Sequence, residues 1–368
     1  MMRVPFADLQ AQYQSIKPDI DQAIQAVIAE TAFIGGKFVQ QFEKEFADAY
    51  GVNHCIPCAN GTDAIYIVLR MLGIGPGDEV ITTACSWIST AETISQTGAS
   101  PVFIDIEPDL FTIDASLIEA AITPHTKAII PVHLYGQIAD MTAITAICEK
   151  YQLYLIEDCA QAHFSTLGGQ KAGTFGQAST FSFFPGKNLG AYGDAGAILA
   201  QDAELARRCR MYANHGALVK HQHEMPGINS RLDGLQAAIL SAKLPHLAGW
   251  LEKRIACADR YDTLLADIPQ VQIPRRRLDS THTFHLYVIR AEQRDALAIF
   301  LKERGIETLI HYPTPLPFLK AYASLAHSPG DFPVAADYQS KILSIPIFPE
   351  LSEEAQVYVA ECIRSFYA

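Results

Sequence analysis

The segment Thr180-Phe-Ser-Phe-Phe-Pro-Gly-Lys-Asn-Leu-Gly190 predicts the fold more clearly than any other part of this sequence. Its apolar first half is typical of a buried strand, and Pro185-Gly186 predicts a turn. The turn presents one lysine, Lys187, and a glycine-rich return follows it. Burial lowers the pKa of a lysine and makes its amine a nucleophile that can form a Schiff base with an aldehyde. A surface turn lysine is the alternative, so the interpretation depends on other segments.

A second segment, His54-Cys-Ile-Pro-Cys-Ala-Asn-Gly-Thr-Asp-Ala64, predicts a short strand, a turn at Asn60-Gly61 and a helix with Thr62 as its N-cap. Free amides at a helix start bind anions, so the segment indicates a phosphate site, although an ordinary capped helix fits it equally well.

Cys55 and Cys58 have the spacing of half a zinc or redox site. No second pair completes it, so we expect these cysteines to pack in the core.

Strands and helices alternate through the first two thirds of the chain. Helices are predicted at residues 7–30, 38–50, 116–122 and 141–151, and strands at residues 79–83, 101–105, 128–132 and 153–158. Near-continuous apolar strands in this order predict an α/β fold with a mostly parallel sheet that is flanked by helices on both faces. Functional residues of such sheets gather at the carboxyl ends of the strands, and Trp87, Asp158 and Lys187 all follow such ends.

The pattern changes after Asp233. A long helical passage over residues 235–264, interrupted near Pro245, leads to a strand at 285–289 and helices at 294–304 and 353–366. At 368 residues the chain is too long for one compact core. We therefore expect a large domain at residues 1–240 and a smaller C-terminal α+β domain at residues 241–368.

Composition excludes several classes of partner. A net charge of −12 argues against binding to nucleic acid or to an anionic membrane, and we expect the basic run Arg275-Arg276-Arg277 to be a solvated loop. No apolar run reaches the length of a membrane span, and the first residues lack a signal-peptide pattern. The eight cysteines are scattered through apolar surroundings, which is typical of a reducing compartment, so we expect a cytoplasmic protein.

Four features together fit an aldehyde cofactor that carries a pyridine ring and a phosphate. Lys187 supplies the amine, and Asp158 supplies a carboxylate that keeps the ring nitrogen protonated. Trp87 can stack on the ring. Amides and hydroxyls for the phosphate come from Gly61, Thr62 and Ser182. Each residue alone has another explanation, such as a helix-capping aspartate, a core tryptophan or a strand serine. Their joint occurrence by chance is much less probable.

Four motifs resemble those of the DegT/DnrJ/EryC1/StrS family, the pyridoxal-phosphate-dependent sugar aminotransferases of fold type I in the aspartate aminotransferase superfamily. They are Asn60-Gly-Thr-Asp-Ala64, Glu157-Asp-Cys-Ala-Gln-Ala-His163, Ser182-Phe-Phe-Pro-Gly-Lys-Asn-Leu-Gly190 and Asn229-Ser-Arg-Leu-Asp-Gly-Leu-Gln-Ala-Ala238. The likeness covers nearly the whole chain, including His311-Tyr-Pro-Thr-Pro-Leu316. It implies a homodimer with active sites at the subunit interface.

The resemblance also implies a role for each matching residue. Lys187 would hold pyridoxal 5′-phosphate and move the proton, Asp158 would pair with the pyridine nitrogen, and Gln161 would bond the ring hydroxyl. Trp87 would stack on the ring. Asn229 would reach the phosphate of the neighbouring subunit's cofactor, beside the phosphate contacts Gly61, Thr62 and Ser182. Four residues lie in motifs near the sugar side, namely His163, Arg231, His311 and Tyr312. No metal ion is implied.

The activity implied is transfer of an amino group from L-glutamate to a nucleotide-linked ketosugar in a carbohydrate pathway, such as polysaccharide biosynthesis. The motif Asn229-Ser-Arg-Leu-Asp233 resembles enzymes that act at C-3 of UDP- or dTDP-linked sugars, 3-keto-hexuronates among them, whereas Trp87 also occurs among C-4 aminotransferases. Two alternatives are a dehydratase and a catalytically idle regulatory homologue. Lys187 argues against the dehydratases, which carry histidine there, and intact Asp158 and Gln161 argue against an idle protein. Ala195 stands where a further glycine is usual.

Overall fold

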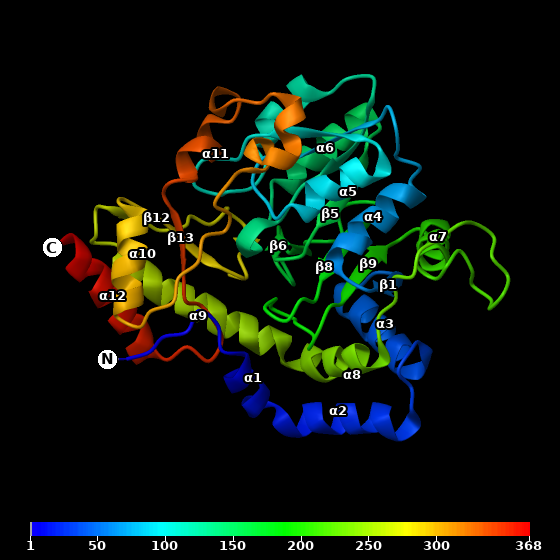
Figure 1. Ribbon diagram of the computed structural model, residues 1–368, viewed down its shortest axis with the longest axis horizontal. Helices are drawn as coiled ribbons and strands as arrows, with labels where there is room; N and C mark the ends of the chain where they lie inside the picture. The colour runs from blue at the N-terminus through cyan, green and yellow to red at the C-terminus, as the bar shows by residue number, and fades with distance from the viewer. Residues whose placement is uncertain (1) are drawn as a thin grey trace.

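The computed structural model describes residues 2–368, and its centre is a seven-stranded sheet in the order β1-β9-β8-β5-β4-β2-β3 (Figure 1). Only β9 runs against its neighbours, pairing antiparallel with both β1 and β8. The predicted mostly parallel sheet is therefore confirmed. The strands are β1 His54–Cys58, β2 Glu79–Thr83, β3 Ser100–Ile104, β4 Thr126–Ile130, β5 Tyr154–Asp158, β8 Ala178–Ser182 and β9 Gly196–Ala200.

Helices cover both faces of this sheet because successive side chains of each buried strand point to opposite sides. Ile129 and Leu155 belong to the core beneath α3 (Gly36–Tyr50), α6 (Met141–Tyr151) and α8 (Gly234–Lys243). Ala128 and Ile156, their chain neighbours, belong to a second core. That core lies beneath α4 (Gly61–Met71), α5 (Ser89–Thr97) and α7 (Ala203–Ala213).

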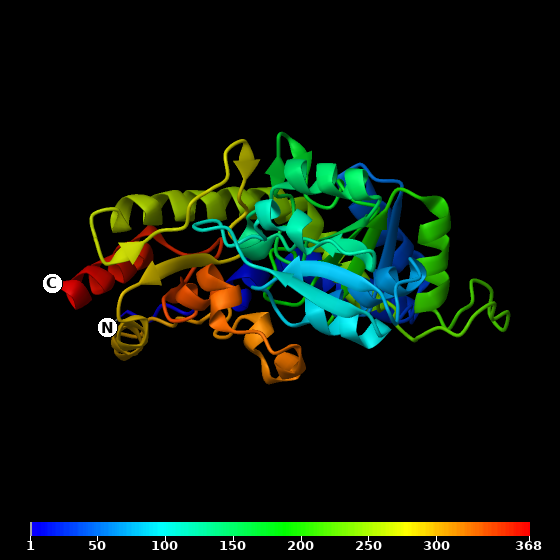
Figure 2. The same ribbon diagram turned by 90° about the horizontal axis from the view of Figure 1, so that it is seen from above.

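A second, smaller sheet lies toward the two chain ends (Figures 1 and 2). Its order is β10-β12-β13, with bounds Val271–Gln272, Tyr287–Ala291 and Ile342–Ile345. The long helix α9 (Leu247–Leu265) runs from beside α8 to α12 (Figure 1). The other helices here are α10 (Arg294–Glu303), α11 (Pro333–Tyr338) and α12 (Glu353–Tyr367). The domain boundary between residues 240 and 241 stays a prediction, and it falls within α8.

Two predicted helices differ from the structure. Residues 7–30 form two helices, α1 (Leu9–Ser15) and α2 (Lys17–Glu30), because Ile16 leaves the helical backbone region and Pro18 opens the second helix. Residues 116–122 form two short 3₁₀ turns, since Thr123 precedes a proline and cannot continue a helix. The 3₁₀ turns are Ala115–Leu117, Glu119–Ala121, Leu134–Gly136, Leu244–His246, Leu316–Phe318, Lys320–Leu325 and Pro329–Asp331.

Several elements were not predicted, namely α5, α7, α11, β9, β10, β13 and a small sheet of β6 (Thr166–Leu167), β7 (Gln170–Lys171) and β11 (Ser280–Thr281). Cys55 and Cys58 are buried in β1, so their predicted core packing is confirmed. None of the helices in residues 2–368 combines the length and the apolar character that crossing a bilayer requires.

The solvated loop predicted for the three consecutive arginines is wrong for two of them. The Arg276 guanidinium pairs with Asp262 at 2.6 Å and lies 4.7 Å from the ring centre of Phe284. The Arg277 side chain is only 13% exposed and pairs with Glu107. Acidic partners from distant segments fold over this run, which the local sequence does not show.

Candidate active site

The candidate residues follow strands that end at one edge of the sheet. Because β1, β5 and β8 point the same way, and β4 and β2 run parallel to β5, their carboxyl ends lie side by side. Gly61 comes three residues after β1, Trp87 follows β2, Asp158 ends β5 and Lys187 follows β8. The topology thus gathers residues that are far apart in the sequence at a single edge, as expected.

Asp158 is a buried carboxylate, only 5% exposed. Its Oδ2 accepts a hydrogen bond of 2.8 Å from the Thr90 hydroxyl, and its Oδ1 accepts one of 3.1 Å from the Ala160 amide. Its backbone links β5 to the segment after β4, since the His133 amide donates to the Asp158 carbonyl at 3.0 Å. Two donors leave further lone pairs of the carboxylate free, so it can accept a proton donor from a bound ring.

Gln161 connects Asp158's loop to two tyrosines. Its Oε1 accepts from the Tyr135 amide at 2.7 Å, and its Nε2 donates to the Tyr312 hydroxyl at 3.0 Å. The Tyr312 ring lies 5.6 Å from the ring of Trp87, centre to centre. Trp87 is 58% exposed, which is unusual for so large an apolar side chain and leaves one side of its ring accessible.

Lys187 lies on a tight turn and its side chain is half-buried. Its amide donates to the Phe184 carbonyl at 2.8 Å, and the Ala191 amide closes the turn on the Phe183 carbonyl at 2.7 Å. Burial lowers the pKa of the Lys187 amine to about 8, and the carboxylate of Asp158 opposes that shift. A larger fraction of the amine is therefore unprotonated and nucleophilic near neutral pH than in an ordinary lysine.

The start of α4 is the predicted cradle for an anion. The N-cap is Asn60, whose side chain accepts from the Asp63 amide at 2.8 Å, so the prediction of Thr62 as N-cap is wrong. Asn60 is extended and can turn its side chain back over the helix start, whereas Thr62 already lies inside the helix. The amides of Gly61 and Thr62 thus stay free for a ligand.

Hydroxyl groups complete this cradle. The Thr62 hydroxyl lies 2.6 Å from that of Ser89, and Ser182 at the end of β8 is the nearest side chain to Gly61. A methyl group on Gly61 would sit 2.8 Å from the Ser182 Cβ, closer than carbon atoms pack. The helix start therefore approaches β8 as closely as it does only because residue 61 is glycine.

Three histidines surround Lys187, and its charge lowers the pKa of each of them after the larger effect of burial. His163 has a pKa of about 3 and is fully buried against Phe181 and Phe183. Its place near the sugar side stays a prediction. His311 has a pKa of about 4, and its Nδ1 lies 2.8 Å from the Ser344 hydroxyl. The third, His285, was not predicted.

Asn229 and Arg231 lie apart from this group in the chain. Both are exposed and lie between α7 and α8, where the chain has returned to the end of α7. Asn229 pairs in a β-bridge with Asn214, and the Arg231 guanidinium donates to the Asn214 side chain at 3.5 Å. Their partners in residues 2–368 therefore do not include Lys187 or Asp158.

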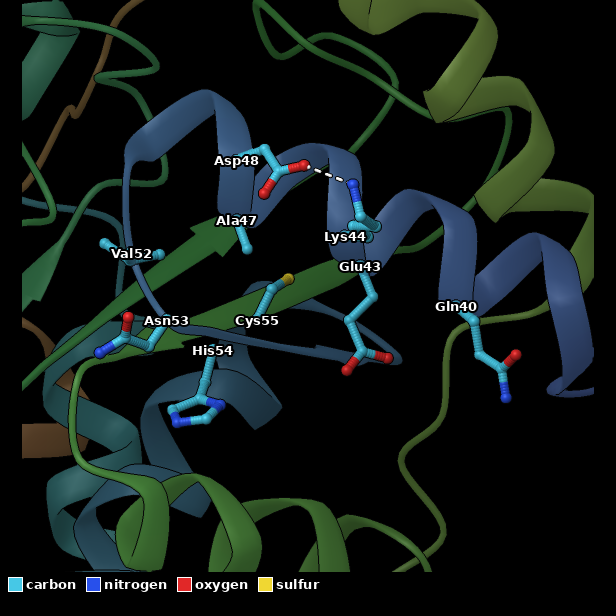
Figure 3. A pocket seen from close by; sticks show the side chains of 9 residues that line it. All are labelled: Gln40, Glu43, Lys44, Ala47, Asp48, Val52, Asn53, His54 and Cys55. Carbon is cyan, nitrogen blue, oxygen red and sulfur yellow. Dashed lines mark hydrogen bonds and ion pairs between the residues drawn. The ribbon is translucent and has the colours of Figure 1, made fainter.

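A cavity of about 280 Å³ lies between α3 and β1, away from the candidate residues (Figure 3). Figure 3 shows Lys44 and Asp48 paired on α3 at its rim, with Asn53 and His54 across from them. None of the residues predicted for the cofactor or the substrate lines it. We assign it no part in the chemistry.

A buried cluster of His133, Glu157 and Cys159 has the residue types of a metal site. The ligand atoms of His133 and Glu157 are already engaged, since His133 Nδ1 accepts from the Ala139 amide and His133 Nε2 lies 3.0 Å from Glu157. Glu157 also accepts from the amides of Gly173, Phe175 and Gly176. The cluster therefore stabilises the fold beside Asp158, and its donors point to no metal.

Comparison with known proteins decides the family. The sequence model of the DegT/DnrJ/EryC1/StrS aminotransferase family matches residues 14–364. The chain belongs to this family. A Geobacillus stearothermophilus relative named pleiotropic regulatory protein is 48% identical over all of this chain and 99% of its own. The dTDP-3-amino-3,4,6-trideoxy-alpha-D-glucose transaminase of Streptomyces venezuelae is 42% identical over 99% of this chain and 96% of its own.

Solved structures of the family agree. The crystal structure of S. venezuelae DesV in complex with a ketimine intermediate matches with a TM-score of 0.97 and 41% identity, over all of this chain and 99% of DesV. Other matching crystal structures hold pyridoxamine phosphate or are PLP forms. The chain is therefore an aminotransferase with this fold, and its cofactor is pyridoxal 5′-phosphate.

The residues present fit this cofactor. Asp158 retains acceptor capacity for a ring nitrogen, and the free amides at the start of α4 suit a phosphate. Within residues 2–368 the Lys187 amine makes no hydrogen bond, and its pKa reflects only burial and the charge of Asp158, so the amine is free to bind an aldehyde. The site's donors and acceptors thus match the three polar parts of the cofactor.

Three neighbours of the site were missed by sequence reasoning, namely Thr90, Tyr135 and His285. Thr90 lies one residue after Ser89 in α5 and looks like an ordinary polar helix residue, although it holds Asp158. Tyr135 has a left-handed backbone with φ of 60° and donates its hydroxyl to the His311 carbonyl. An unusual backbone at a non-glycine residue marks functional sites, but only a structure reveals it.

The cradle at the start of α4 gives a first prediction. Gly61→Ala places a methyl group 2.8 Å from the Ser182 Cβ, so α4 must move away from β8. We expect affinity for pyridoxal 5′-phosphate to fall by roughly tenfold or more, which corresponds to one or two lost hydrogen bonds. Titration of the apoprotein with the cofactor measures this.

The matched control is Gly249→Ala in α9, where nothing lies within 4 Å of the added methyl group. This variant should keep its cofactor affinity and gain about 0.5–1 kcal/mol of stability, because alanine favours helix. Equal cofactor affinity of Gly61→Ala and wild type would contradict the assigned cradle.

Proposed function

We propose that this aminotransferase moves an amino group from L-glutamate to C-3 of a nucleotide-linked ketosugar. The observation that carries the proposal is the turn of Lys187, whose amine has a lowered pKa and faces the charge of Asp158. The position on the sugar is supported by the relatives' names. The S. venezuelae relative is named for a dTDP-3-amino sugar, and others are named for UDP-linked 3-dehydro or 3-oxo sugars, a glucuronate among them.

Bound pyridoxal 5′-phosphate would supply an aldehyde carbon and a ring that withdraws electrons from it. Lys187 would bind the aldehyde and, once displaced by an amino donor, move a proton to and from the substrate carbon. Asp158 would hold a proton on the ring nitrogen, while Gln161 would bond the ring hydroxyl and Trp87 would stack on the ring.

The cradle would hold the phosphate through three residues of this chain, Gly61, Thr62 and Ser182. Arg231, His311 and Tyr312 would face the sugar. The His311 carbonyl accepts a hydrogen bond from the Tyr135 hydroxyl, and the Tyr312 hydroxyl accepts one from Gln161, so both residues lie at the site. Arg231 is exposed and cationic, which suits the phosphates that link a nucleotide to its sugar.

Two other functions compete with this one. A C-4 aminotransferase is favoured by Trp87, which lies beside Tyr312 on the exposed side of the site. A regulatory role is favoured by the name of the G. stearothermophilus relative. The regulatory role does not explain why Lys187, Asp158 and Gln161 are held together with free donors and acceptors. A dehydratase would need a different residue at position 187.

The position of amination is tested by product analysis. The holoenzyme is incubated with L-glutamate and a UDP- or dTDP-linked 3-keto sugar, and in a separate reaction with L-glutamate and the corresponding 4-keto sugar. Nuclear magnetic resonance then identifies the aminated carbon, and 2-oxoglutarate is quantified. We expect one equivalent of 2-oxoglutarate per amino sugar, with the nitrogen on C-3. Amination of the 4-keto sugars alone would replace the proposal by the C-4 alternative, and sugar turnover without glutamate consumption would indicate a dehydratase.

We also propose a cytoplasmic homodimer with shared active sites. The cysteines in residues 2–368 are unpaired, which suits a reducing compartment. Trp87 and Phe184, both more than half exposed, are large apolar side chains next to the site. Asn229 and Arg231 are exposed between α7 and α8, where a second copy can contact them. These features support a partner that completes each site.

Subunit mixing tests the shared site. Lys187→Ala and Asn229→Ala are each expected to be impaired as homodimers. If Asn229 serves the partner's site, a mixed dimer has one site with both defects and one intact site. A statistical mixture should then recover about a quarter of wild-type activity, since half of its molecules are mixed dimers. Activity no higher than the mean of the two variants would show that Asn229 serves its own chain.

A further inference from the structure

Lys243, the last residue of α8, is a second buried lysine that the proposed chemistry does not use. Its side chain is fully buried, and its Nζ donates a hydrogen bond of 2.6 Å to the Gly190 carbonyl. No carboxylate in residues 2–368 lies within ion-pair distance of it. Its charge instead lies 4.9 Å from the ring centre of Tyr192 and 5.9 Å from that of Trp250.

Burying a lysine without an ionic partner is costly, so a fold keeps one only where its contact matters. Burial lowers the pKa of Lys243 to about 8, and the carboxylate of Glu350 opposes the shift. At neutral pH the ammonium is still the main form. The contact that it makes is with the segment that returns from Lys187.

That segment is packed too tightly to move on its own. A methyl group on Gly190 would lie 2.2 Å from the Pro185 carbonyl oxygen, so the Gly190 backbone rests directly on the turn that presents Lys187. The Ala191 amide donates to the Phe183 carbonyl at 2.7 Å and closes the same turn. A displacement of Gly190 would therefore be transmitted to Lys187.

Helix α8 holds this return at two points. Gln236 lies seven residues before Lys243, so both side chains project from one face of the helix. The Gln236 Oε1 accepts from the Tyr192 amide at 2.8 Å, while Lys243 donates to the Gly190 carbonyl. No other donor in the described residues reaches that carbonyl. One face of α8 thus holds the Gly190 carbonyl and the Tyr192 amide, the backbone groups on either side of Ala191.

We propose that Lys243 is a positioning residue of the reaction, whose ammonium group fixes the Gly190 carbonyl and thereby the turn that presents Lys187. It touches neither cofactor nor substrate in this account. Its effect on Lys187 is mechanical, because the Lys243 charge is not among the causes of the lowered pKa of Lys187, which are burial and Asp158. The inference rests on the role of Lys187 in the proposed function.

The test compares Lys243→Met, which removes the donor and the charge at similar length, with Lys243→Arg, which keeps both. The first readout is trace acetylation of the full-length apoprotein with acetic anhydride across a pH series, followed by peptide mass spectrometry. In wild type, Lys187 should react with a midpoint of about 8. In Lys243→Met, a loosened turn should move that midpoint toward the ordinary value of 10.5.

The second readout is the rate at which L-glutamate converts the holoenzyme in a single half-reaction. We expect Lys243→Met to slow this rate by roughly ten- to a hundredfold, as for a misplaced reactive group, and Lys243→Arg to restore most of it. Acetylation needs no substrate. A failure of glutamate as donor would therefore abolish the second readout in wild type too, and leave the first intact.

A stability control separates positioning from unfolding. Leu301→Ala empties a fully buried site in α10, in a core cluster that contains none of the turn residues. It should lower the melting temperature but leave the Lys187 midpoint in place. An unchanged midpoint and a half-reaction rate within about twofold of wild type in Lys243→Met would overturn the proposal. The same midpoint shift in Leu301→Ala would also overturn it.

Discussion

Lys187→Ala is expected to reduce kcat by at least about 10³-fold, because one side chain supplies both the covalent attachment and the proton transfer. The variant should still fold. The Lys187 amine makes no hydrogen bond within residues 2–368, so removing the side chain leaves no buried group without its hydrogen-bond partner. It should also still bind pyridoxal 5′-phosphate, because Asp158 and the start of α4 remain.

Steady-state turnover and borohydride treatment measure this effect together. In wild type, reduction with borohydride should fix the cofactor on the peptide that contains Lys187, whereas the variant should carry it only non-covalently. Lys44→Ala is the control, since that side chain is 80% exposed and pairs with Asp48 on the surface of α3. Turnover within about tenfold of wild type in Lys187→Ala would exclude Lys187 as the catalytic amine.

Asp158→Asn is expected to lower kcat by roughly 10²- to 10³-fold, as when a preorganised charge is removed from a site. Asparagine has nearly the same shape. Its Oδ1 can still accept from the Ala160 amide, and its Nδ2 can donate to the Thr90 hydroxyl, which accepts as well as donates. It carries no negative charge and cannot keep a ring nitrogen protonated. The fold should therefore persist, and pyridoxal 5′-phosphate should bind in a less reactive state, visible in its absorbance.

Glu157→Gln provides a control on the same strand. Glu157 points to the opposite face and accepts from three backbone amides, those of Gly173, Phe175 and Gly176. The NH2 group of glutamine would face at least one of these N–H donors and leave it without an acceptor. We therefore expect the free energy of unfolding to fall by about 3 kcal/mol. Its kcat per folded molecule should stay close to that of wild type. Denaturant unfolding and turnover together separate the two variants, and equal kcat losses would contradict the role of Asp158.

Much of the fold was predictable because the buried strands are short apolar runs that alternate with helices. The helix at residues 141–151 matches α6 at both ends, since Asp140 caps its start. The antiparallel strand β9 was not predicted, because its five residues Gly196–Ala200 form only a short apolar run directly after the glycine-rich return. Direction within a sheet depends on partner strands, which a local pattern does not contain.

The site was predictable where chemistry dictates the residue type. Lys187 and Asp158 follow strand ends, and the topology brings them to one edge. Thr90 and Tyr135 were missed because their roles arise from partners 68 and 26 residues away, Asp158 and Gln161. Tertiary contacts of this kind leave no periodic signal in the sequence.

The most direct test of the account is the near-visible absorbance of the purified protein with pyridoxal 5′-phosphate, before and after addition of L-glutamate. We expect wild type to show a cofactor band that glutamate bleaches as pyridoxamine phosphate forms, and Lys187→Ala not to complete this conversion. A wild-type protein that shows no band with added cofactor, or a band that glutamate leaves unchanged, would contradict the claim that Lys187 and Asp158 form a glutamate-dependent aminotransferase site.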